Sequence, residues 1–83
     1  MRITFASHGW ADCTSWAGER KVLLRINRMI TEAARDPGVG IGKPARLSGD
    51  LSGCWSRRID QEHRLVHTVD GDRLVVLQAR YSC

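Results

Sequence analysis

Apolar residues recur along this chain with two different periods, and these periods predict its secondary structure. Polar and apolar residues alternate over residues 2–6, which indicates a short first strand. Ser7 is a suitable N-cap for a helix over residues 8–17. The side chains expected on one face of that helix are Trp10, Cys13 and either Trp16 or Ala17.

A second, longer helix is predicted over residues 19–35. Its apolar residues recur at spacings of three and four and form one stripe, made of Val22, Leu23, Ile26, Met29, Ile30 and Ala33. The basic residues expected to face away from this stripe are Arg20, Lys21, Arg25 and Arg28. Asp36-Pro37-Gly38 ends the helix. The glycine-rich residues 38–44 follow as a connector, because they lack the P-loop spacing and open no helix.

Beyond this connector the period changes to two, which indicates strands over residues 55–59, 64–69 and 73–81. Asp70-Gly71-Asp72 is a hairpin turn signal between the last two. Residues 1–83 therefore predict a single α+β domain. In it, two N-terminal helices pack on one face of a mainly antiparallel sheet of about four to five strands.

Alternation also divides the polar side chains between the two faces of the sheet. We expect the helices to cover Ile59, Leu65, Val69 and alternate members of residues 74–77. Arg58, Arg64 and the end of the last strand would then meet on the open face, where guanidinium groups can bind the phosphates of single-stranded RNA.

The simpler alternative is that these arginines pair with acids on a solvent-exposed face, and spacing alone favours it. The acids within reach are Asp60, Glu62 and Asp72. His63 and His67 have the chemistry of a general acid or base, although histidines at strand edges are more often structural. His67 alternates onto the face opposite Arg64, which makes it a poor catalytic candidate.

Composition and charge narrow the class of protein. The 42% hydrophobic and 27% charged content is typical of a globular chain, and the net charge of +4 favours an anionic partner. Eleven of the thirteen basic residues are arginine. The three cysteines form no C-x-x-C pair, and the N-terminus has no signal-peptide pattern. We therefore expect a reduced, cytoplasmic protein with no membrane span.

Four segments resemble the YoeB toxins, which belong to the RelE-type superfamily of bacterial toxin–antitoxin systems. They are residues 42–44 (GKP), 51–53 (LSG), 55–59 (WSRRI) and 62–66 (EHRLV). The resemblance implies a microbial RNase-like fold and cleavage of mRNA in the A site of the 30S ribosomal subunit. It also implies a YefM-type antitoxin as partner, frequent homodimerisation, and chemistry without a metal or cofactor.

The resemblance further implies a mechanism and its residues. A base activates the ribose 2′-hydroxyl, arginines stabilise the pentacovalent phosphate, and an acid protonates the leaving 5′-oxygen, which leaves a 2′,3′-cyclic phosphate. Arg58 and Arg64 match the family's phosphate-stabilising arginines, and Glu62 matches as well. The basic residues expected to contact RNA are Lys43, Arg46, Arg57, Arg58 and Arg80.

Four positions depart from the family pattern. Ala45 replaces the glutamate proposed as general base, and Ser48 replaces a lysine. Ser82 and Cys83 replace a histidine with an acid/base role and a tyrosine that contacts the transition state. The altered catalytic positions Ser82 and Cys83 thus lack the family's chemistry.

Different classes of function stay open at this point. One is an endoribonuclease that relies on charge stabilisation, on Glu62 or His63, and on groups of the ribosome. Another is a catalytically impaired homologue that only binds the antitoxin and the ribosome or RNA. A plain RNA- or DNA-binding module, using the basic residues 20–35, is an unrelated alternative.

Overall fold

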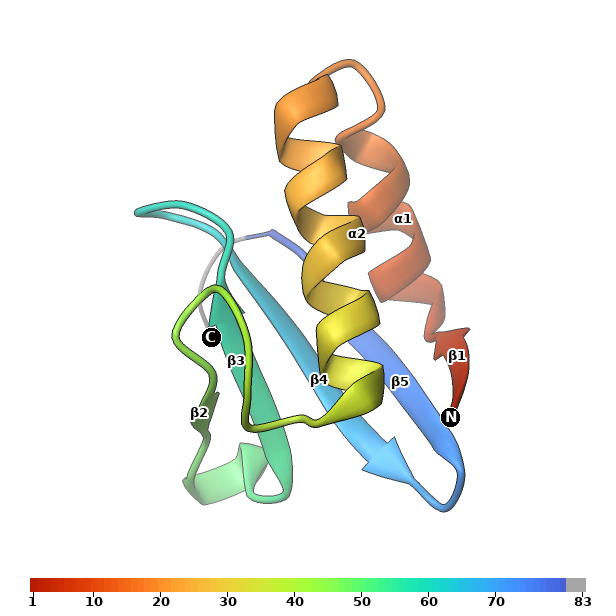
Figure 1. Cartoon of the computed structure of the whole chain (residues 1–83), viewed down its shortest axis with the longest axis vertical. Coiled ribbons are helices and arrows are strands. Elements are labelled where there is room, and N and C mark those ends of the chain that lie inside the picture. Colours follow the sequence, from red (N-terminus) through yellow and green to blue (C-terminus); the bar gives the residue numbers. More distant parts are fainter. Residues whose placement is uncertain (81–83) are drawn as a thin grey trace.

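The computed structural model of the chain describes residues 1–80 and shows two helices packed against a five-stranded sheet (Figure 1). The elements in chain order are β1 (Arg2–Phe5), α1 (Ser7–Ser15), α2 (Arg20–Arg35), β2 (Ala45–Arg46), the 3-10 turn η1 (Gly49–Leu51), β3 (Cys54–Arg58), β4 (Arg64–Asp70) and β5 (Arg73–Gln78). Both helices cover the same face of the sheet, so the predicted α+β class and layering are confirmed.

The strands lie in the order β1-β5-β4-β3-β2. All neighbours pair antiparallel except β1 and β5, which are parallel, so the prediction of a mainly antiparallel sheet is confirmed. The edge strand β2 was not predicted, since two residues are too few to show a period. It pairs Ala45 with Ser56 and Arg46 with Trp55.

The core lies between α2 and the central strands, as the apolar stripe predicts. Ile26, Met29 and Ala33 of α2 are completely buried. The fully buried apolar side chains that face them from the sheet include Leu65, Leu74 and Val76. Val69, which we expected in the core, is instead 37% exposed. It stands next to the β4–β5 hairpin, at the end of the sheet.

The first helix differs in detail from its prediction. Ser7 is the first helical residue rather than the N-cap, and Ala6 holds the cap position without a side-chain hydrogen bond. The buried face of α1 is formed by Gly9, Cys13 and Trp16, at spacings of four and three. Trp10 is therefore rotated away from that face and is 58% exposed.

Helix α1 is joined closely to the end of β5. The indole N–H of Trp16 donates to the carbonyl of Ala79 at 2.8 Å, and the N–H of Ala79 donates to Asp12 Oδ2 at 3.0 Å. A Cβ at Gly9 would collide with the backbone carbonyl of Val76. Glycine at position 9 thus lets α1 approach the backbone of β5.

Within the described residues, no helix is long and apolar enough to cross a membrane.

This close approach predicts the effect of a methyl group at position 9. Alanine is intrinsically the better helix former by about 1 kcal/mol. Gly9→Ala should nevertheless lower the free energy of unfolding by about 1–3 kcal/mol, because backbone must move to accept the methyl group. Gly18→Ala is the matched control, since a Cβ there meets nothing within 4 Å. Urea unfolding measures both, and equal stabilities for the two variants would contradict the close approach.

Candidate functional site

The face of the sheet opposite the two helices, called the open face below, brings together two of the predicted site residues. Arg58 of β3 lies directly opposite Arg64 of β4. The next row across the same face contains Ala45, Ser56, Val66 and Gln78, from β2, β3, β4 and β5. Ala45, one of the positions that depart from the family pattern, thus lies two residues along the sheet from the arginine pair.

The two arginines have no carboxylate partner within residues 1–80. Asp72 pairs with Arg2 at 3.6 Å instead, and Asp60 Oδ1 accepts backbone N–H groups at the β3–β4 turn. The alternative in which acids of this region neutralise the arginines is therefore not what the structure shows. Like charges directly opposite each other destabilise a strand pair, so this position is suited to an anion.

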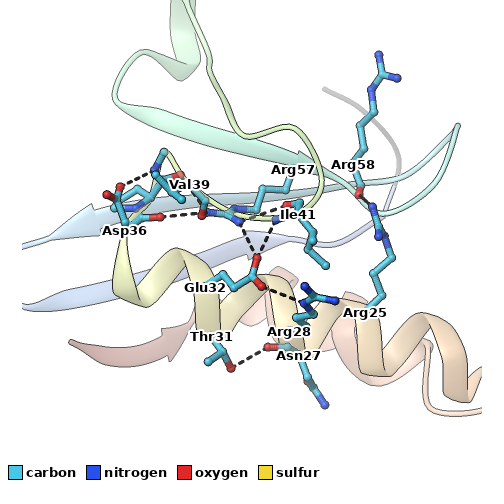
Figure 2. A network of polar contacts seen from close by, with 12 residues as sticks. Arg25, Asn27, Arg28, Thr31, Glu32, Asp36, Val39, Ile41, Arg57 and Arg58 are labelled. Carbon is cyan, nitrogen blue, oxygen red and sulfur yellow. Dashed lines mark hydrogen bonds and ion pairs between the residues drawn. The ribbon is translucent and has the colours of Figure 1, made fainter.

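The backbone of Arg58 is fixed from two directions. Its N–H donates to the carbonyl of Gly42 at 2.6 Å, and its carbonyl accepts from Arg25 Nη2 at 3.0 Å. Arg25 Nε also donates to the carbonyl of Ile59 at 3.0 Å. Figure 2 shows the Arg58 side chain pointing away from α2 while its backbone is held from that side. Arg25 was expected to face away from the core, and that expectation is wrong.

Arg57, the neighbour of Arg58, lies on the opposite face and is completely buried. Its Nη2 donates to the carbonyls of Asp36, Pro37 and Val39 at 3.1, 3.2 and 2.7 Å, and its Nη1 donates to Ile41 at 3.2 Å (Figure 2). We expected Arg57 to contact RNA. Its burial is incompatible with that role, since the guanidinium is enclosed by the connector between α2 and β2.

Glu32 of α2 completes the surroundings of this buried charge. Its Oε1 lies 3.9 Å from Arg57 Nη1 and accepts the N–H of Ile41 at 2.7 Å, while its Oε2 accepts from Arg28 Nε at 2.9 Å. The hydrogen bonds from Ile41 and Arg28 lower the pKa of Glu32, so the carboxylate stays ionised. Burial lowers the pKa of Arg57, whereas Glu32 and Asp36 raise it.

Glu62 and Arg80 both line a pocket of about 490 Å³ at the β3–β4 turn, whose lining does not include Arg58 or Arg64. Arg80 stacks over the ring of Trp16 at 3.8 Å and donates from Nε to Ser15 Oγ at 2.6 Å. The side chain of Glu62 is 80% exposed, and its Oε2 is 3.9 Å from Nε2 of His63. The predicted convergence of the end of the last strand with the other arginines is thus not observed for Arg80.

The remaining predicted RNA contacts lie at the edge of the sheet. Lys43 is exposed in the loop before β2, with a left-handed φ of 51°. Arg46 stacks over Trp55 at 4.9 Å, and the register of β2 and β3 puts both on the face opposite Ala45. Ser82 and Cys83 lie outside the described residues. The predicted RNA-contacting residues are therefore distributed over several surfaces rather than one.

Comparison with known proteins identifies the family. Residues 5–83 match the model of the YoeB-like toxin of bacterial type II toxin-antitoxin systems. The Toxin YoeB of Streptomyces coelicolor is 62% identical over 82 residues, which are 98% of each chain.

Solved structures of YoeB toxins have the same fold as this chain. The YoeB/ParE toxin from Agrobacterium tumefaciens superposes with a TM-score of 0.94 at 40% identity, over 100% of both chains. Two structures from Staphylococcus aureus are also similar: the toxin in the YoeB-YefM complex, with a TM-score of 0.89, and the YoeB dimer, with a TM-score of 0.90. Both are 34% identical to this chain, and each match covers 100% of this chain and 98% of the other. The chain belongs to the YoeB toxin family. It is a toxin of a type II toxin–antitoxin system.

Sequence patterns missed two residues that support the toxin's open face, Arg25 and Glu32. Arg25 lies three residues after Val22 and four before Met29, at the border of the apolar stripe. That position directs its long side chain to the sheet and was a usable signal. Glu32 has an i,i+4 partner in Arg28, but it also accepts the backbone N–H of Ile41 in the connector, and no sequence period reports that contact.

His67 is buried beside Arg57 on the helix-covered face of the toxin. It is completely buried, and neither ring nitrogen has a hydrogen-bond partner within the described part of the chain. Burial, with the charge of Arg57, lowers its pKa from 6.5 to about 4. His67 is therefore neutral at pH 7, and its place in the core agrees with its dismissal as a catalytic candidate.

Within residues 1–80, no group of three or more His, Cys, Asp or Glu side chains is arranged to hold a metal ion.

The lowered pKa of His67 predicts an acid-sensitive fold. Below the unfolded pKa of 6.5, the unfolded chain takes up a proton that the folded chain accepts only near pH 4. The free energy of unfolding should fall through this interval, by up to about 3 kcal/mol. His67→Phe should remove this component of the pH dependence. Urea unfolding at several pH values tests both proteins, and parallel stability profiles would show that His67 does not titrate as expected.

Proposed function

We propose that this toxin is a ribosome-dependent mRNA endonuclease of reduced activity, acting in the bacterial cytoplasm. The observation that carries the proposal is the pair of guanidinium groups of Arg58 and Arg64. They lie opposite each other on the open face and have no carboxylate partner within residues 1–80. Arginine pairs with phosphate oxygens through two parallel hydrogen bonds and stays charged at all relevant pH values.

In the proposed reaction the ribose 2′-hydroxyl attacks the adjacent phosphorus. The bond to the 5′-oxygen breaks, the products carry a 2′,3′-cyclic phosphate and a free 5′-hydroxyl, and no water is consumed in the step. Negative charge accumulates on the phosphate oxygens during the attack. Arg58 and Arg64 would stabilise this charge from two neighbouring strands, which hold them in place before the substrate arrives.

Proton transfer is the weak part of this site. The methyl group of Ala45 cannot accept the proton of the 2′-hydroxyl, and Ser82 cannot donate one near neutral pH. Glu62 and His63 line the pocket that Trp16 and Arg80 also line, and Arg58 and Arg64 are not among its lining residues. We therefore assign proton transfer to groups of the ribosome or to solvent, and charge stabilisation to the toxin itself.

We further propose a YefM-type antitoxin as the partner of this chain, since the Staphylococcus aureus relative forms such a complex. A homodimer is the second proposed assembly, because a dimer is also found for that relative. Trp10 is a candidate contact in the dimer. It is 58% exposed and packs edge-to-face with Phe5 at 5.4 Å, so that two aromatic side chains are grouped at one place on the surface.

Loss of one arginine of the pair should abolish mRNA cleavage. Arg64→Ala removes a group that stabilises transition-state charge, and such losses typically reduce rates about 10²–10³-fold. Arg73→Ala is the matched control, because it removes the same charge from an exposed position on β5. The assay is induction without antitoxin, followed by mapping of mRNA 5′ ends on stalled ribosomes. Absence of growth arrest and of cuts in the unaltered chain would instead leave a homologue that only binds.

Restoring the family's residues should raise toxicity. The replacement of Ala45 by Glu, Ser82 by His and Cys83 by Tyr supplies both proton-transfer groups, whose contribution is typically about 10²–10⁴-fold. The measurement is the cleavage rate and the growth arrest after induction, with antitoxin co-expression as the control that reverses both. A folded triple variant that stays inert would contradict this explanation of the reduced activity.

A further inference from the structure

The buried Arg57 is linked to the open face through the connector and β2. Its guanidinium donates to four backbone carbonyls between residues 36 and 41. Glu32 accepts the backbone N–H of Ile41 in the same segment. A Cβ at Gly40 would meet both Glu32 and the Arg57 guanidinium. Residues 36–41 are thus folded around one charged side chain. We call this arrangement the Arg57 clasp.

The clasp ends where the open face begins. The carbonyl of Gly42, the next residue, accepts the N–H of Arg58 at 2.6 Å. Gly42 has a φ of +89°, and a Cβ there would lie 2.8 Å from Met29 Sδ and 3.0 Å from Arg57 Cβ. Only glycine fits this left-handed and crowded position, so the chain passes from the clasp to β2 along a fixed path.

The strand that carries residue 45 is too short to hold itself in place. β2 has two residues, and among the strands of residues 1–80 it is an edge strand that pairs with β3 alone. Its further supports are the hydrogen bond from Leu47 N–H to Cys54 at 3.0 Å and the stacking of Arg46 on Trp55. The Trp55 ring in turn lies 3.3 Å from the Cβ position of Gly38, inside the clasp.

We propose that Arg57 and Glu32 are positioning residues for the open face: by folding residues 36–41 against β3, they determine where residue 45 lies relative to Arg58. Neither residue touches the reacting atoms. The proposal rests on the proposed function only for what residue 45 does in catalysis. Where residue 45 lies is a structural statement that can be tested without cleavage.

Amide hydrogen exchange of the isotope-labelled full chain is the first test. Glu32→Gln removes the charge facing Arg57, and it should reduce the protection of the Arg58 and Leu47 amides about tenfold or more while leaving the Ala6 amide protected. Ala6 reports the distant bond to Val76. Arg28→Gln is the matched control, since it removes the exposed partner of the same carboxylate. Arg57→Lys keeps the positive charge but removes the planar set of guanidinium N–H donors, so it should reduce the protection of the same amides as Glu32→Gln does.

The second test is a double-mutant cycle with Ala45→Glu, read as cleavage rate on ribosomes. Ala45→Glu alone should raise the rate, and Glu32→Gln should reduce that gain about tenfold or more, because a misplaced base loses most of its advantage. If Glu32 had a purely structural role, Glu32→Gln would lower the cleavage rate by the same factor with and without Ala45→Glu. The rate gain from Ala45→Glu would then be unchanged. Arg28→Gln should also leave the gain intact.

The outcomes separate this inference from the proposed function. Unchanged protection at Arg58 and Leu47, or equal loss at Arg58, Leu47 and Ala6, overturns the positioning role. If Ala45→Glu gives no gain in the otherwise unaltered chain, the assigned role of position 45 fails. The exchange data then decide the positioning role alone.

Discussion

The burial of one positive charge, that of Arg57, organises the part of this toxin that its sequence marks as functional. A buried guanidinium needs hydrogen-bond acceptors and a counter-charge, or its desolvation penalty is not offset. Here the acceptors are four backbone carbonyls of a glycine-rich connector, and the counter-charge is Glu32 of α2. A segment without helix or strand structure of its own therefore has a defined path, because the charge at its centre requires one.

Arg57 and Arg58 show how strongly position decides the role of a residue. They are adjacent and chemically identical, yet one lies at 0% exposure beneath α2 and the other is exposed on the opposite face. The alternation of a β-strand separates them, and the register of β3 against β4 then places Arg58 opposite Arg64. The same alternation puts His67 in the core, beside the charge that helps to keep it neutral.

The sequence predicted those features that depend on long periodic segments. The stripe of α2 and the three long strands gave the layers of the fold, and alternation gave the placement of Arg58 and Arg64 on one face. What could not be predicted depends on long-range geometry. The parallel pairing of β1 with β5 joins the first strand to the last, and β2 is too short for any period. Arg46, Arg58 and Arg80 were all expected to contact RNA, but nothing in their spacing shows that Arg80 turns toward Trp16 and Arg46 toward Trp55.

The pair of Arg58 and Arg64, which has no carboxylate partner within residues 1–80, has a consequence for the folded state itself. In the unfolded chain the two guanidinium groups are far apart on average, whereas folding brings them face to face at an energetic cost. An anion that binds between them binds the native state alone, and by mass action it shifts the folding equilibrium toward that state. Anion binding at this pair would make the thermodynamic stability of the protein depend on the anions in its buffer, so that chloride and phosphate solutions would not be equivalent conditions in which to compare its variants.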